Sequence, residues 1–160
     1  MENGSRDDLQ SASNVLAKYA EGGLLSRPLQ KRIEDLLRRY IQSFQGRLED
    51  MFVSEYMLDG SPEYESVWFF SRQECAVVMD FVKSDAFDIV RIERTVTYLH
   101  VEPRAYDFGI PVGSSRLQVF FKTDNGFAGT LKASGANCEY LRDVMAKYLR
   151  PNMRQMAQAV

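Results

Sequence analysis

The stretch RLQVFFKTDNGFAGTLKAS, residues 116–134, determines more of the expected fold than any other part of the chain. Two apolar runs flank Asn125 and Gly126, and this dipeptide between apolar runs is a strong signal for a β-hairpin. A two-residue turn would set Phe121 beside Thr130 and mix polar with apolar side chains on one face. A three-residue loop with Gly126 in a left-handed conformation avoids this mixing, so we predict it. The predicted pairs are Leu117 with Ala133, Val119 with Leu131 and Phe121 with Gly129.

An amphipathic helix is expected directly after the hairpin. It starts near Asn137 and stops before Pro151, which cannot continue a helix. Lys147 and Arg150 lie where cations stabilise a helix C-terminus. No comparable stripe follows, so residues 151–160 are expected to form a frayed tail. The apolar face of the helix comprises Cys138, Leu141, Val144, Met145, Tyr148 and Leu149.

Residues 1–60 are expected to form an N-terminal helical extension. A short helix is predicted between Ser5 and Ala20, and a long amphipathic helix between Arg27 and Leu58. The stripe of the long helix either covers the core of the chain itself or forms the seam of a homodimer. The residues from Phe52 onward also alternate as in a strand, which leaves the end of this helix open. The stripe, and so the candidate self-association surface, consists of Ile33, Leu37, Tyr40, Phe44, Leu48 and Met51.

Residues 61–150 are expected to hold an antiparallel sheet and the C-terminal helix that closes it. Ser66–Phe70 is rich in strand-forming residues and is predicted to be a strand. Cys75–Val82 fits a strand by alternation and a helix by its apolar face, with Ser71 and Glu74 at the spacing of a helix capping box. Between these two alternatives the strand is favoured.

Two irregular stretches are expected in the same region. The apolar positions of Phe87–Val101 change parity along the run, which indicates a bulge or break near Arg94. Residues 102–115 contain two prolines, two glycines and two serines and are predicted to form a long loop.

The order of these elements resembles that of the pleckstrin-homology-like barrel. The resemblance spans roughly Glu63–Leu149, and its most suggestive parts are the run FDIVRIE at residues 87–93 and the hairpin followed by a helix. It implies an α+β fold in which a C-terminal helix plugs a strongly bent antiparallel sheet or partly open barrel. Members that bind phosphoinositides use clustered Lys and Arg in an early loop, whereas the turn after Phe70 offers Arg72 beside Glu74. The resemblance therefore does not imply a lipid-binding site.

Composition excludes several classes of function. The formal net charge of −2 gives no global field that would attract nucleic acid, so none is expected as a partner. Cys75 and Cys138 lie far apart without paired spacing, which is typical of buried, reduced thiols. No apolar run reaches the roughly 18 residues of a membrane helix, and the N-terminus lacks the pattern of a signal peptide. We therefore expect a cytoplasmic protein.

No catalytic or metal-binding motif is recognisable. His100 is the only histidine, and it lies mid-strand, where a structural or surface role is favoured over catalysis. One histidine and two distant cysteines cannot form a zinc site. The glycines match neither phosphate-binding pattern. We predict no catalytic residue, no metal and no cofactor, with an enzyme that uses only carboxylates, Tyr or Arg as an alternative.

Basic and aromatic residues are expected to converge near one end of the sheet. They suit an anion or a peptide carboxylate, and the alternative is a solvated strand face paired with Glu93 and Glu102. The leading prediction is a non-catalytic protein-interaction or adaptor module that binds another protein or itself as a homodimer. A peripheral membrane binder of anionic headgroups is the alternative. The candidate contact residues are Arg91, Arg94, Arg104, Arg116, Tyr98 and His100.

Overall fold

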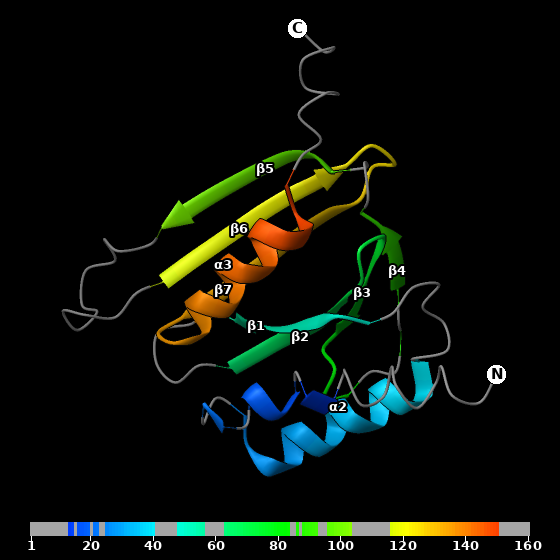
Figure 1. The fold of residues 1–160 in the computed structure, drawn as a ribbon, viewed down its shortest axis with the longest axis vertical. Helices are drawn as coiled ribbons and strands as arrows, with labels where there is room; N and C mark the ends of the chain where they lie inside the picture. Colours follow the sequence, from blue (N-terminus) through cyan, green and yellow to red (C-terminus); the bar gives the residue numbers. More distant parts are fainter. Residues whose placement is uncertain are drawn as a thin grey trace, which may run out of the picture. The chain divides into compact units, whose positions relative to one another are not determined.

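The computed structural model of the chain is an α+β structure with antiparallel strands, as predicted (Figure 1). The structure describes residues 13–14, 16–19, 21–22, 25–40, 48–56, 63–83, 86, 88–92, 96–103 and 116–150. In chain order the elements are α2 (Arg27–Tyr40), β1 (Asp50–Tyr56), β2 (Glu63–Phe70), β3 (Glu74–Met79), β4 (Asp88–Arg91), β5 (Val96–Pro103), β6 (Arg116–Thr123), β7 (Ala128–Ser134) and α3 (Asn137–Tyr148). Residues 13–14, 16–19 and 21 are helical as well.

The strands pair as two sheets, and the chain divides into two compact units. The sheets have the orders β1-β2-β3-β4 and β5-β6-β7. The first unit comprises Met1–Val53 and Glu65–Arg91, and the second comprises Ser54–Tyr64 and Ile92–Val160. Both units thus draw on residues before and after position 60. The division into a helical extension, a β domain and a tail stays a prediction, because compactness alone does not show which segment folds by itself.

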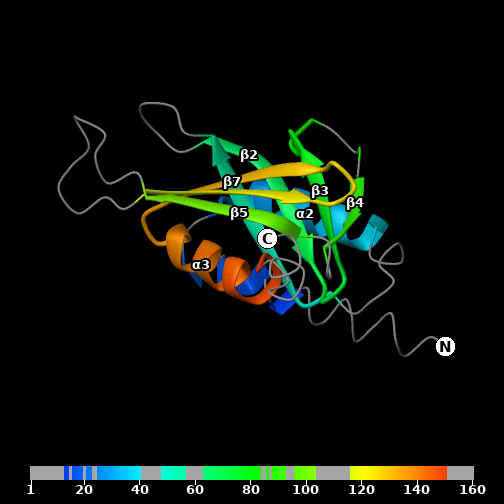
Figure 2. The same cartoon turned by 90° about the horizontal axis from the view of Figure 1, so that it is seen from above.

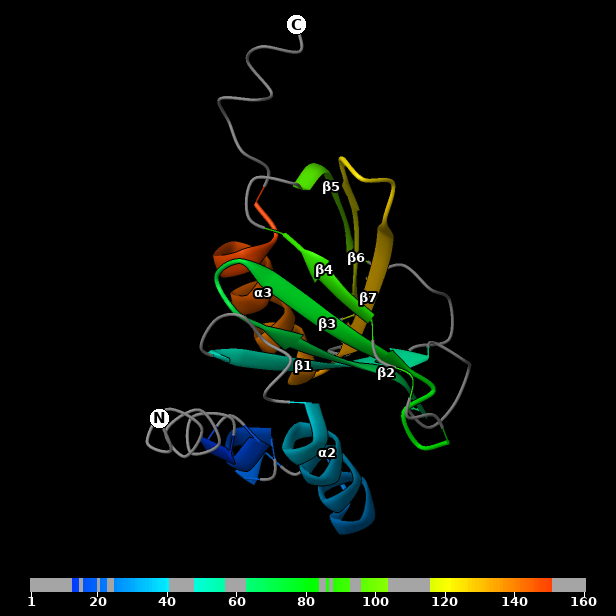
Figure 3. The ribbon, with the colours of Figure 1, turned by 90° about the vertical axis from the view of Figure 1, so that its right-hand side faces the viewer.

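Helix α2 lies beside the strands of the first unit (Figure 3). It buries Ile33, Leu36 and Leu37, which recur at the three- and four-residue spacing of one helical face. On the flank of the helix, Arg32 Nε donates a hydrogen bond to the carbonyl oxygen of Phe81 at 2.8 Å. The described part of the predicted stripe therefore covers the core of its own chain.

The helical residues before α2 contribute to the same core. Leu16 and Tyr19 lie in the region of the predicted short helix, and both are buried. The hydroxyl of Tyr19 accepts a hydrogen bond from the backbone N–H of Val53 at 3.2 Å, which satisfies a buried donor of β1. Leu25, in the connection to α2, is buried too. Among the described residues, no helix combines the length and the apolarity needed to cross a membrane.

The prediction of one helix from Arg27 to Leu58 is wrong at its C-terminal end. Helix α2 is described to Tyr40, residues 41–47 lie outside the described residues, and Asp50–Tyr56 is strand β1. Met51, Phe52 and Val53 are consecutive and all buried, so β1 is covered on both faces. Consecutive apolar residues in such a strand match both the period of a strand and the period of a helix. Met51 therefore fitted the helical spacing of the predicted stripe although it lies in a strand.

The favoured alternative for Cys75–Val82, a strand, is confirmed over most of its length. Strand β3 spans Glu74–Met79 and forms a hairpin with β2, and a turn follows it. Ser71 N–H donates to the carbonyl of Glu74 at 2.9 Å, and Ser71 Oγ accepts from Glu74 N–H at 3.1 Å. Ser71 and Glu74, which have the spacing of a helix capping box, thus close a two-residue hairpin turn and do not cap a helix. The pair Phe69 and Ala76 is buried on one face of this hairpin, and the pair Trp68 and Val77 is buried on the other.

The hairpin of β6 and β7 has the predicted register. Leu117 pairs with Ala133, Val119 with Leu131 and Phe121 with Gly129. Gly126 has φ +89°, which is the left-handed conformation that the three-residue loop requires. Thr123 N–H closes the loop on the carbonyl of Phe127 at 2.9 Å. Strands β5, β6 and β7 lie side by side, and α3 crosses one face of this sheet (Figures 1 and 2).

Helix α3 begins at Asn137, as predicted, and its buried residues include Cys138, Leu141, Val144 and Tyr148. Its N-cap residue, Ala136, offers no side-chain cap. Gly135, with φ +56°, turns the chain from β7 into the helix. The predicted tail after Pro151 lies outside the described residues.

The predicted bulge or break near Arg94 lies outside the described residues and stays a prediction. Within β5, the register against β6 shifts between Val96 and Tyr98, so an irregularity lies at Thr97. Most of the predicted loop, residues 104–115, lies outside them as well, and residues 102–103 belong to β5. Both cysteines are free and buried, as expected.

Candidate partner-binding face

The sheet of β5, β6 and β7 has one buried and one partly exposed face. Along β6, Leu117, Val119 and Phe121 are buried on the face that α3 covers (Figure 2). The residues between them point the other way, because successive side chains of a strand alternate. We call this other side the outer face. Its described side chains are Tyr98, His100, Arg116, Gln118, Phe120, Lys122, Ala128, Thr130, Lys132 and Ser134.

Two aromatic rings and one ammonium group meet on the outer face. The rings of Tyr98 and Phe120 are edge-on at 68°, with centroids 6.1 Å apart. Lys122 Nζ lies 5.6 Å from the Phe120 centroid and 5.9 Å from the Tyr98 centroid. At exposed positions such a cation–π contact contributes about 0.5–1 kcal/mol. The cluster of Tyr98, Phe120 and Lys122 therefore forms an apolar platform with a cation already placed on it.

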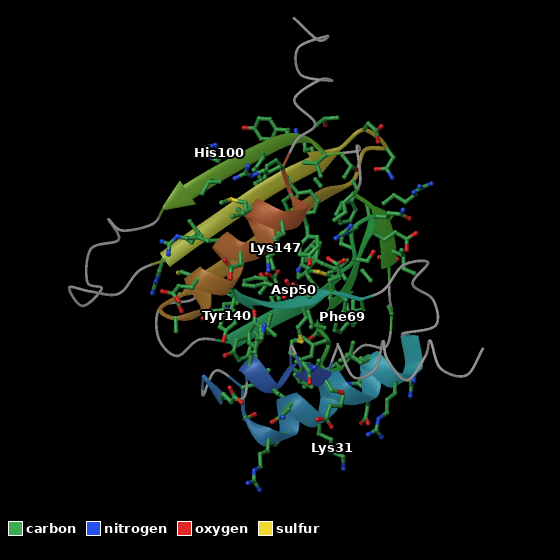
Figure 4. The ribbon with its side chains drawn as sticks, viewed as in Figure 1. Lys31, Asp50, Phe69, His100, Tyr140 and Lys147 are labelled. Atoms are coloured by element: carbon green, nitrogen blue, oxygen red, sulfur yellow. The ribbon has the colours of Figure 1, made fainter. Side chains whose placement is uncertain are left out.

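Strand register explains why these side chains meet. Tyr98 lies opposite Lys122, and His100 lies opposite Phe120. Side chains of opposed residues stand on the same face, at a separation that rings and long side chains bridge. His100 is exposed on β5, where Figure 4 labels it. The imidazole thus borders the platform without lying in a buried site.

Strand β5 is also an edge strand, since β6 is its one hydrogen-bonded neighbour among the described strands. Tyr98 is 48% exposed and Val101 is 37% exposed, and they are the large apolar side chains of the second unit that the described residues leave most open. Between Val96 and Val101 the strand carries no Lys, Arg, Asp or Glu. Edge strands are usually blunted by charge or by proline. The N-terminal part of β5 has neither, which suits a strand that meets a partner.

Basic residues outnumber acidic ones on the outer face. Arg116, Lys122 and Lys132 project from it, and the register partner of Gln118, Glu102, is an acidic residue of the same face. The carboxylate of Glu55 reaches Ser134 at one end of β7, but this group is 4% exposed and hydrogen-bonded inside the unit. The face therefore combines exposed aromatic surface with more basic than acidic residues, features that suit an anionic segment carrying apolar side chains.

The predicted contact residues are only partly brought together. Tyr98 and His100 lie on one face of β5, and Arg116 lies on the same side of the sheet, four residues from Phe120 along β6. At a rise of about 3.3 Å per residue this separation is roughly 13 Å. Arg91 is exposed at the end of β4 in the first unit. Arg94 and Arg104 lie outside the described residues.

Phe120 and Lys122 were missed by the sequence reasoning. The alternation of β6 already showed that both face away from the core. Which residues of β5 stand beside them depends on the register shift at Thr97, and that shift leaves no clear signal in the sequence. The pair could have been proposed as exposed, but not as neighbours of Tyr98.

The predicted self-association residues are buried where the structure describes their side chains. Ile33 and Leu37 are covered on α2, Leu48 precedes β1, and Met51 lies in β1. The side chains of Tyr40 and Phe44 lie outside the described residues. The homodimer seam stays a prediction, although these four buried residues already pack within one chain.

A second polar cluster holds the start of α3 in place. The Glu55 carboxylate accepts hydrogen bonds from Ser134 N–H at 2.6 Å, from Ser134 Oγ at 2.6 Å and from Asn137 Nδ2 at 3.1 Å. Burial, followed by the negative charge of Glu55, raises the pKa of Tyr64. Three donors on one buried carboxylate fix the turn between β7 and α3, so we assign this cluster a structural role.

The Cys75 thiol is not activated for nucleophilic chemistry. Burial, and then the charge of Glu74, raises the pKa of the Cys75 thiol to about 12, so this thiol is protonated and a poor nucleophile at neutral pH. No three His, Cys, Asp or Glu residues gather into a possible metal site within the described ranges.

Comparison of the chain with protein-family models, with curated proteins and with solved structures finds no match.

Proposed function

We propose that this chain is a non-catalytic interaction module that binds an acidic protein segment on the outer face of β5 and β6. The observation that carries this proposal is the exposed cluster of Tyr98, Phe120 and Lys122. Such a cluster is an anchor because its rings exclude water around a cation and strengthen the attraction to a carboxylate.

The chemistry of the partner follows from the surface. Lys122 supplies a hydrogen-bond donor to a Glu or Asp side chain, and the adjacent rings offer surface to an aromatic or aliphatic neighbour of that carboxylate. Arg116 and Lys132 extend the positive charge beyond the cluster on the same face. An extended segment with acidic and apolar residues in alternation would present both features to the sheet.

The proposal includes the pleckstrin-homology-like arrangement as its structural frame. Two antiparallel sheets, a closing hairpin and a C-terminal helix support that arrangement. An adaptor role without catalysis agrees with a face whose binding groups are rings and cations.

The alternative of a membrane contact through Arg91, Arg94, Arg104 and Arg116 gains no support from the described residues. Arg91 belongs to the first unit and Arg116 to the second, and the other two arginines are not described. We therefore do not carry that arrangement forward.

The test is a binding titration of the full chain with a dye-labelled peptide rich in glutamate and tyrosine. We expect saturable binding that weakens as salt rises, and about tenfold weaker binding for Lys122→Glu, because that substitution replaces one attraction by one repulsion. Tyr98→Ala should weaken binding as well, through loss of the ring surface.

Two controls make this titration specific. Arg142→Glu makes the same change of charge at an exposed position on α3 and should leave the affinity within about twofold. A lysine-rich peptide of the same length should not bind. Equal losses for Lys122→Glu and Arg142→Glu would show that only net charge matters, and the proposed face would then be wrong.

A further inference from the structure

Strand β5 has an open edge with definite limits. It is the outermost strand of its sheet, and among the described strands it pairs with β6 alone (Figure 1). Its register against β6 is continuous from Tyr98 to Pro103 and is interrupted before Tyr98 by the shift at Thr97. At the other end Pro103 has no backbone N–H to donate. A regular ladder on the open edge is therefore confined to residues 98–102, with His100 at their centre.

The hydrogen bonds of β6 show toward which side each of its backbone groups points. Thr123 N–H donates to the carbonyl oxygen of Phe127 at 2.9 Å and closes the hairpin with β7, so Thr123 is directed toward β7. Successive residues of an antiparallel strand direct their backbone groups to opposite sides. Three residues back along β6, Phe120 is therefore directed toward β5.

The same alternation assigns the backbone groups of β5. Phe120 lies opposite His100, so the N–H and C=O groups of His100 are directed toward β6. Those of Leu99 and Val101 consequently point away from β6, to the open edge. Leu99 and Val101 thus each present a donor and an acceptor to a further strand.

Side chains on both faces of this edge are left uncovered. Tyr98 is 48% exposed on the outer face. Val101 is 37% exposed on the other face, where its opposed residue on β6, Val119, is buried. Strand edges that lack charge readily accept another strand. The stretch from Val96 to Val101 contains no Lys, Arg, Asp or Glu, so it has no such charge to hinder pairing.

We propose that β5 pairs in antiparallel orientation with β5 of a second copy of this chain, about a twofold axis at His100. In this register Leu99 of each copy exchanges both backbone hydrogen bonds with Val101 of the other. The same two side chains cover each other on the face that α3 covers. On the outer face Tyr98 of each copy lies opposite Glu102 of the other, which sets a phenol donor against a carboxylate acceptor.

The edge is complementary to itself, which selects a second copy as the occupant. An axis at Val101 would pair Leu99 with Pro103, which lacks the N–H, and an axis at Leu99 would bring in Thr97, where the strand is irregular. The axis at His100 avoids both faults and gives each outward donor an acceptor. It also sets no two residues of like formal charge directly opposite each other, so Coulomb repulsion between opposed side chains does not work against the pair.

This pairing is separate from the binding of an acidic segment proposed above. It uses the backbone edge of β5, whereas the acidic segment is proposed to contact the rings of Tyr98 and Phe120 and the ammonium group of Lys122. These groups stay on the outer face of each copy, because pairing at an edge extends a sheet sideways. Either proposal can therefore fail without the other.

The first measurement is sedimentation of the full chain at pH 8 over a range of concentrations. An interface one strand wide is smaller than that of a stable complex, so we expect a monomer–dimer equilibrium with a dissociation constant of about 100 µM. The average mass should rise toward that of two chains between about 10 µM and about 1 mM. A monomer at all these concentrations would overturn the proposal.

Disulfide trapping tests the register. In His100→Cys the two thiols would lie at the twofold axis, in an opposed pair with Cα atoms about 4.5 Å apart, which a disulfide can bridge. In the matched control Tyr98→Cys they would lie four residues apart along the paired strands, roughly 13 Å, which it cannot. We expect cross-linked dimer under mild oxidation for His100→Cys alone, since the native Cys75 and Cys138 are buried. Equal cross-linking of the two variants, or none in His100→Cys, would contradict this register.

A charge on the edge tests the contact itself. Val101→Lys places an ammonium group among the apolar side chains of the pair and should raise the dissociation constant of the dimer at least tenfold. The control Val82→Lys makes the same change at an exposed valine of the first unit and should alter it by less than twofold. Binding of the glutamate-rich peptide should survive Val101→Lys, which distinguishes failure of the pairing from failure of the proposed function. If Val101→Lys dimerises as strongly as the unmodified chain, the edge of β5 is not the contact and the proposal is wrong.

Discussion

The hairpin of β2 and β3 and the sheet of β5, β6 and β7 differ in how many of their faces are buried. Phe69 and Trp68 are neighbours in sequence on opposite faces of β2, and both are buried. In β6, Phe121 is buried while its neighbour Phe120 is partly exposed beside Lys122. A strand covered on both faces is committed to the core, whereas a strand covered on one face keeps a surface that a partner can use.

The same type of substitution should therefore have unequal effects in the two sheets. Phe69→Ala removes a ring buried on β2 and should lower the free energy of unfolding by about 4 kcal/mol. Phe120→Ala removes a ring from the outer face and should cost about 1 kcal/mol or less. Urea unfolding followed by circular dichroism measures both. Similar losses for the two variants would contradict the assignment of an outer face.

The next largest effect is expected at Glu55. Glu55→Ala leaves the partly buried N–H and hydroxyl of Ser134 and the buried amide of Asn137 without this acceptor, so we expect a loss of about 3 kcal/mol in the free energy of unfolding. Glu139→Ala removes an exposed carboxylate from the first turn of α3 and should cost about 0.5 kcal/mol. Equal effects at the two positions would show that the Glu55 hydrogen bonds do not hold the start of α3.

A smaller effect is expected in the loop between β6 and β7. Gly126→Ala puts a Cβ on a residue with φ +89°, and the left-handed conformation should cost about 1–2 kcal/mol. Asp124→Ala, in the same loop, should have less effect, because Asp124 is exposed. Thermal unfolding of both variants makes the measurement, and an unchanged midpoint for Gly126→Ala would argue against the three-residue loop.

Under ordinary conditions the effect is absent, but at alkaline pH we expect a dependence of stability on pH. Burial raises the pKa of Cys75 from 9.0 to about 12. Below pH 9 the thiol is protonated in both states. Between pH 9 and 12 it ionises only in the unfolded chain, so its contribution to stability falls by about 1 kcal/mol per pH unit as pH rises. Cys75→Ala should show a shallower fall in urea unfolding over this range, and identical slopes would indicate that the thiol is accessible.

The contrast between the two sheets also explains what the sequence could predict. The register of β6 and β7 followed from the turn signal at Asn125 and Gly126 together with alternation, because the apolar side chains of this hairpin lie mostly on one face. In Cys75–Val82 both faces are apolar, so helix and strand periods fitted almost equally well. The same cause produced the error at Met51, a residue of a doubly buried strand that extended the helical stripe of α2 by coincidence of spacing.

The candidate face could be predicted only in part. Tyr98 and His100 stood out by residue type, and the structure places both on the outer side of β5. Their neighbours Phe120 and Lys122 follow from the register of β5 against β6, which depends on the shift at Thr97.

The central claim is that the sheet of β5 to β7 keeps a face for a partner while β2 and β3 do not. Amide hydrogen exchange of the full chain with and without the glutamate-rich peptide tests it most directly. The account predicts slower exchange in residues 96–101 and 116–123 on addition of the peptide, with no change in residues 66–79. Slowing confined to residues 66–79, or spread evenly over both sheets, would contradict it.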